Sequence, residues 1–173
     1  MTVEHKVGKP VLGFVVLFAV LAACVPVPTM TGPHLRPDYQ GRARVEVGTT
    51  CQGAIPYIWI IGPQKVRQKV LVRQDEAGRA VLELSAMPLK GLASEMPPIT
   101  ISSLTSGKTQ TVAAESVEII GALWIAKFPL REGIQAAYRV QLPAIDVKQE
   151  AWSPGVVELR PIAARPYLPP FNC

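Results

Sequence analysis

The sequence has little histidine. Only two of its 173 residues are histidines, His5 near the N-terminus and His34 in a proline-rich stretch. The region after residue 41 therefore has none, which excludes a Ser-His-Asp or Cys-His arrangement from it and argues against a zinc site. The acidic residues show no spacing typical of a carboxylate-pair hydrolase. We therefore expect no enzymatic activity, no metal and no cofactor.

The longest apolar stretch is too short to cross a membrane as a helix. It runs from Val11 to Ala23, whereas a spanning helix needs about 20 apolar residues. Pro26 and Pro28 follow it and do not continue a helix. Lys6 and Lys9 precede it. A short basic stretch before a compact apolar run that ends in small residues is typical of a secretory signal.

The signal ends in Leu21-Ala22-Ala23-Cys24, which resembles the lipobox of bacterial lipoproteins. The resemblance implies that residues 1–23 are a signal peptide and that Cys24 carries a thioether-linked diacylglycerol. Several acyl chains on one residue hold a protein firmly on a membrane. Val25 follows the cysteine where an Asp resembles an inner-membrane retention signal, so the resemblance favours the outer membrane, facing the periplasm. A plain cleaved signal is the alternative.

The surplus of positive charge is modest. Removal of residues 1–23 takes two lysines and one glutamate from 18 basic and 13 acidic residues, which leaves a formal charge of +4. Such a surplus is compatible with an anionic partner but equally with an ordinary solvated surface. A protein that is exported before it folds has no nucleic acid as a partner, so we expect none.

Three cysteines are present, and lipidation of Cys24 leaves Cys51 and Cys173. Two remaining cysteines in an oxidising compartment predict one disulfide bond. It would close a loop of about 120 residues and stabilise the fold by roughly 4–5 kcal/mol in the chain-entropy model. Two free thiols are the alternative. No Cys-x-x-Cys motif occurs, which argues against a redox role.

Residues 24–41 contain several prolines and little apolar periodicity, so we expect a semi-extended tether that holds the domain some tens of ångströms off the membrane. Residues 42–173 form the expected domain. Their period-2 alternation, interrupted by prolines and glycines, predicts an all-β antiparallel β-sandwich, immunoglobulin-like or transthyretin-like, with a small closed β-barrel as the alternative. The expected strands are Arg42–Val47, Tyr57–Ile61, Val66–Arg73, Arg79–Leu84, Ile99–Leu104, Thr109–Val112, Ser116–Ile120, Leu123–Phe128, Ala137–Leu142 and Val156–Leu159. The segment Leu89–Met96 is expected to hold a short helical turn.

The alternation of the third and fourth expected strands predicts a hairpin with a defined register. Val66, Val70 and Val72 share one face, as do Ala80, Leu82 and Leu84. Both sets point inward if Arg73 lies opposite Arg79, which places Val70 opposite Leu82 and Lys69 opposite Glu83.

The outer face of this hairpin is the first candidate partner contact. Arg67, Lys69, Arg73 and Arg79 line it, with only Glu83 in opposition. They predict either a docking stripe for an anionic partner or an ordinary solvated strand face. Trp152 is the second candidate, because a tryptophan in an expected loop either anchors an interface or folds back over the sandwich edge.

We therefore expect a lipid-anchored envelope protein that acts as a binding or scaffold module for another envelope protein. An inhibitor or immunity-like protein that blocks an envelope enzyme or receptor is the alternative. An enzyme that uses carboxylates alone is a third hypothesis, and it requires two acids within about 5–10 Å in a cleft.

Overall fold

A computed structural model describes residues 29–51, 53–87, 96–147 and 150–167. Within these ranges the chain forms strands, turns and one short 3-10 helix, η1 (Pro63–Lys65), and no α-helix. The expected helical turn at Leu89–Met96 lies almost entirely outside the described residues.

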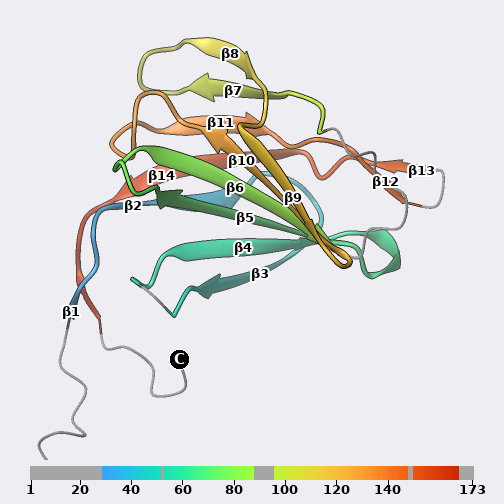
Figure 1. The fold of residues 1–173 in the computed structure, drawn as a ribbon, viewed down its shortest axis with the longest axis horizontal. Helices are drawn as coiled ribbons and strands as arrows, with labels where there is room; N and C mark the ends of the chain where they lie inside the picture. Colours follow the sequence, from blue (N-terminus) through green and yellow to red (C-terminus); the bar gives the residue numbers. More distant parts are fainter. Residues whose placement is uncertain (1–28, 52, 88–95, 148–149, 168–173) are drawn as a thin grey trace, which may run out of the picture.

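Two antiparallel sheets make up the fold (Figure 1). The first has six strands in the order β3-β4-β5-β6-β10-β9. Their bounds are β3 (Arg44–Thr49), β4 (Pro56–Ile61), β5 (Arg67–Gln74), β6 (Ala80–Met87), β10 (Leu123–Pro129) and β9 (Ser116–Ile120). The second has five strands in the order β2-β14-β11-β7-β8. Their bounds are β2 (His34–Tyr39), β14 (Val156–Ile162), β11 (Tyr138–Gln141), β7 (Ile99–Ser103) and β8 (Thr109–Val112).

Two small strand pairs complete the described chain. One joins β1 (Thr29–Met30) to β15 (Pro166–Tyr167), and the other joins β12 (Ile145–Val147) to β13 (Glu150–Trp152). The architecture is an antiparallel β-sandwich, as the alternation predicted. The alternative of a closed barrel is wrong, because the described strands form two separate large sheets.

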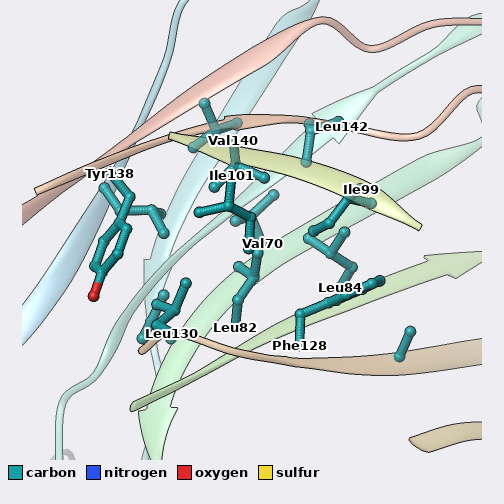
Figure 2. Packing of buried hydrophobic residues seen from close by; sticks show 14 of the residues in the cluster. Val70, Leu82, Leu84, Ile99, Ile101, Phe128, Leu130, Tyr138, Val140 and Leu142 are labelled. Atoms are coloured by element: carbon teal, nitrogen blue, oxygen red, sulfur yellow. The ribbon is translucent and has the colours of Figure 1, made fainter. Parts of the chain in front are cut away.

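The core lies between the two large sheets. Figure 2 shows Val70 and Leu84 of the six-stranded sheet facing Ile101 and Val140 of the five-stranded sheet. All four side chains are at most 1% exposed. Their burial follows from the pleat, because alternate residues of a strand point to the same side of a sheet.

All ten expected strands are present, with ends that differ by a few residues. The apolar strands β4 and β10 both lie inside the six-stranded sheet, with a neighbouring strand on each side. Their outward side chains, such as Trp59 and Ile125, are half-buried.

The expected extent of the tether is wrong in part. His34–Tyr39 was assigned to it, but these residues form β2, and Leu35 is fully buried in the core. In the sequence, Pro37 argues against a strand, because proline has no N–H to donate to a sheet. β2 lies at the edge of the five-stranded sheet, which is where a strand tolerates proline.

The expected hairpin register is wrong by two residues. Val70 lies opposite Leu84, and Arg73 lies opposite Val81. A shift of two keeps every side chain on its face, so the predicted inward sets are confirmed as buried. The Asp75 carboxylate causes the shift, since it accepts hydrogen bonds from the N–H groups of Ala77 and Arg79. This closes a tight turn and pairs Gln74 with Ala80.

Candidate functional site

Three of the four predicted cations lie on the outer face of the six-stranded sheet. Arg67, Lys69 and Arg73 alternate along β5 with residues that point into the core. The Lys69 ammonium lies 4.4 Å from the centre of the Tyr57 ring and 5.9 Å from that of Trp59. These distances are those of cation–π contacts. Arg79 lies at the end of the β5–β6 turn, next to this face.

The expectation that only Glu83 opposes these cations is wrong. Arg67 lies 3.7 Å from Glu46, and Arg73 contacts Glu83. Acidic groups therefore accompany both arginines of β5: Glu83 comes from the neighbouring strand β6, and Glu46 comes from β3, two strands away.

Arg79 is held between two carboxylates, at 2.7 Å from Asp75 and 3.6 Å from Glu115. Hydrogen bonds from the Arg79 backbone and side chain hold the pKa of Asp75 below its usual value. A general acid needs a raised pKa, so the environment of Asp75 is the opposite of what acid catalysis at neutral pH requires.

Trp152 lies in a strand, although a loop was expected there. In β13 it pairs with Ile145 of β12, and this small hairpin stands at one end of the sandwich (Figure 1). The indole is half-buried and packs against the core and against Gly62 at the end of β4. Three-residue strands carry too little alternation to be recognised in a sequence.

Trp152 forms one wall of a shallow depression of about 530 Å³. The end of β2 contributes Tyr39, and the β2–β3 connection contributes the exposed Arg42. The Tyr39 hydroxyl donates a hydrogen bond to the carbonyl of Pro154, which fixes the two walls relative to each other. The remaining lining residues are Gly41, Ala43, Ile61, Gly62, Pro63, Ser153 and Gly155.

Glycines make this depression possible. A Cβ atom on Gly41 would come within 2.0 Å of the Tyr39 hydroxyl, and one on Gly62 would come within 2.7 Å of the Trp152 ring. Real Cβ atoms do not approach other atoms so closely. The Tyr39 ring therefore occupies the space of a side chain at Gly41, and the Trp152 ring occupies the space of a side chain at Gly62. Sequence reasoning singled out Trp152 but missed Tyr39 and Arg42.

A second, more enclosed cavity of about 200 Å³ lies between the β7–β8 turn and the loop after β10. Glu132 accepts hydrogen bonds there from the hydroxyls of Ser103 (2.7 Å) and Ser106 (2.5 Å). These bonds lower the pKa of Glu132. Both hydroxyls already donate to a carboxylate that is stabilised in its charged form. We interpret this cluster as a structural link between the two loops.

The described part of the chain contains no group of three or more His, Cys, Asp and Glu side chains that could hold a metal ion. Nor does any helix there have the length and apolar character needed to span a membrane. Cys51 is exposed in the turn that follows β3. Cys24 and Cys173 lie outside the described residues, so the predicted lipidation site and disulfide partner stay predictions.

Comparison with protein-family models, with curated proteins and with solved structures returns no significant match to this chain.

Proposed function

We propose that this chain is a lipid-anchored envelope protein that binds another protein through the Trp152 depression. The observation that carries the binding role is the convergence of Trp152, Tyr39 and Arg42 around one surface hollow. Tryptophan, tyrosine and arginine are the residues enriched among the hot spots of protein interfaces.

The fixed position of the two aromatic rings supports this role. Trp152 is packed against Gly62, and Tyr39 is hydrogen-bonded to Pro154. Side chains that are already ordered lose little conformational entropy when a partner binds. Arg42 is exposed at the rim and is available to a carboxylate or carbonyl of the partner.

The lipobox-like Leu21-Ala22-Ala23-Cys24 supports the anchor, and the export it implies places the domain in the periplasm, most consistently at the outer membrane. We propose no catalysis and no cofactor. In support, His34 is the one histidine after the proposed signal peptide, and the pKa values of Asp75 and Glu132 are lowered rather than raised.

We also propose a Cys51–Cys173 disulfide bond. The turn that contains Cys51 lies beside the start of β2, since the His34 ring contacts the Gly53 carbonyl at 3.2 Å. His34 pairs with Ile162 at the end of β14, and β15 follows shortly after. The six residues after Tyr167 extend to at most about 20 Å, so Cys173 can reach this turn. An intact mass of the chain from its native membrane tests both assignments: residues 24–173 plus lipid, with a gain of two hydrogens on reduction.

The test of the binding role is photo-crosslinking in the native envelope. A photo-reactive amino acid replaces Ser153, an exposed residue that lines the depression, in one strain and the exposed Lys108 of the β7–β8 turn in a control strain. We expect one discrete adduct from position 153, and we expect its yield to fall at least tenfold when Trp152→Ala is added. Circular dichroism and the urea midpoint of the purified variants show whether the fold is retained.

Equal adducts from both positions, or none from position 153, would contradict the proposal. The activity of the captured partner distinguishes an inhibitor from a scaffold. An enzyme or receptor whose activity is blocked while it is bound would identify this chain as an inhibitor, whereas an unaffected partner would identify a scaffold.

A further inference from the structure

We infer that the partner of the β1–β15 end of the sandwich is a lipid bilayer surface, and that the C-terminal strand holds the domain against it. This inference rests on the proposed lipidation of Cys24. The position of strand β1 sets how far the domain can lie from this anchor.

The first described strand, β1, begins five residues after Cys24. Thr29 pairs with Tyr167, and Met30 pairs with Pro166. The backbone N–H of Thr31 donates to the Arg165 carbonyl at 2.9 Å, and the Thr31 hydroxyl both donates to that carbonyl and accepts from the Arg165 N–H. Thr31 is 3% exposed. The first strand is therefore fixed to the C-terminal segment by backbone and side-chain hydrogen bonds.

The pairing with β15 shortens the connection to the membrane. Between the Cα atoms of Cys24 and Thr29 lie five residue steps, which extend to at most about 17 Å. Without β15, the first strand held by the sandwich would be β2, which begins at His34. The expected separation of some tens of ångströms is thus too large, and the β1–β15 end lies next to the bilayer.

The binding depression lies at the other end of the same strand. β2 begins at His34 beside the β1–β15 pair and ends at Tyr39, which lines the depression (Figure 1). Six residues of strand extend about 20 Å. Trp152 therefore lies at the end of the sandwich away from the bilayer. The fifteen residue steps from Cys24 to Tyr39 extend to at most about 50 Å, so the depression lies within about 50 Å of the bilayer. A partner of this surface must itself be on, or close to, the same membrane.

The experiment uses the lipidated full-length chain, reconstituted into vesicles of phosphatidylethanolamine and phosphatidylglycerol that carry a short-range quencher on the headgroups. A fluorescent amino acid replaces Thr49, which is exposed at the β3–β4 turn near the membrane end, or Ile120, which is 60% exposed at the β9–β10 turn of the other end. We expect quenching at position 49 to exceed that at position 120 at least threefold.

The matched variant has twenty Gly and Ser residues inserted between Val27 and Pro28. A flexible linker of that length has an end-to-end distance of about 25 Å, so it should remove most of the quenching at position 49. Equal quenching at both positions in the natural chain, or no effect of the insertion, would overturn the inference. The intact mass of the same sample separates this result from failure of the anchor: a mass without lipid contradicts the proposed function, whereas a lipidated chain with equal quenching contradicts this inference alone.

Discussion

Gly62 lies so close to the ring of Trp152 that a Cβ atom there would come within 2.8 Å of three ring atoms, two of them at 2.7 Å. The backbone of Gly62 is extended, with a φ of −92°, so the glycine is required by the ring and not by its own conformation. Gly62→Ala should force the indole away from the sandwich end and destabilise the protein by about 1–3 kcal/mol, as overpacking commonly does. Urea unfolding measures this change.

Gly32→Ala is the matched control, because the nearest atom to a Cβ there, in the ring of His34, is 4.0 Å away. The Gly62 variant should also lose the adduct from position 153, since Trp152 no longer forms the wall of the depression. Equal unfolding midpoints for the two alanine variants would show that the indole does not need this glycine.

Gln68 is a fully buried polar side chain whose amide nitrogen and oxygen both lack a hydrogen-bond partner. It points into the core from β5, between Ile60 and Ala86 on the neighbouring strands. A buried polar group without partners costs about 1–3 kcal/mol. Gln68→Met has a similar volume and should therefore raise the free energy of unfolding by about 1–2 kcal/mol.

The control for this prediction is Gln135→Met on the exposed loop after β10, where methionine should leave the urea midpoint within experimental error. A destabilised Gln68→Met variant would indicate that the amide is satisfied in solution by an internal water.

The positions of the strands could be predicted from the sequence, but their partners could not. Alternation marks which residues of β5 and β6 point inward, and it is unchanged by a shift of two residues. The pairing of Val70 with Leu84 instead of Leu82 depends on the hydrogen bonds of the Asp75 carboxylate in the turn. β2 was missed because Pro37 is read as a sign of a linker, although an edge strand tolerates it.

The binding depression shows the same limit. Trp152 is conspicuous in the sequence, whereas Tyr39 and Arg42 belong to a stretch assigned to the tether and its border. Tyr39 and Pro154 are 115 positions apart and are joined only by the folded sheets. A local sequence pattern contains no information about such a contact, because the contact is created by the order of the strands in the two sheets.

Glu83 is a carboxylate on the outer face of the sheet that is only 5% exposed, and Arg73 is its ion-pair partner. Arg73→Gln should leave the carboxylate nearly buried without its partner and destabilise the protein by about 1–3 kcal/mol. The double variant Arg73→Gln, Glu83→Gln should recover part of this loss, because no charge is then left behind.

The exposed pair of Arg67 and Glu46 supplies the comparison, since both side chains are at least 40% exposed and 3.7 Å apart. Its double-mutant cycle should give a coupling of about 0–1 kcal/mol. A coupling for Arg73 and Glu83 no larger than that value would mean that water still reaches the Glu83 carboxylate.

His34 should make the stability of the domain depend on pH in a range where its carboxylates do not. Burial is the main cause that lowers the pKa of His34, and the nearby charge of Arg165 lowers it further, while the contact with the Gly53 carbonyl opposes both. The unfolded chain therefore binds a proton at higher pH than the folded chain does. Stability is complete above the unfolded pKa of about 6.5 and falls as the pH drops toward the lower folded pKa.

The measurement is the free energy of unfolding in urea between about pH 8 and about pH 5, for the natural chain and for His34→Gln. Glutamine keeps a hydrogen-bond donor for the Gly53 carbonyl but does not titrate, so the slope in this range should disappear. The lowered pKa values of Asp75, Glu132 and Glu158 act only below this range, because those groups lose their stabilising charge as the pH falls through still lower values. An identical slope in both proteins would show that His34 titrates in the folded domain as it does in the unfolded chain, and that the turn containing Cys51 leaves its ring open to water.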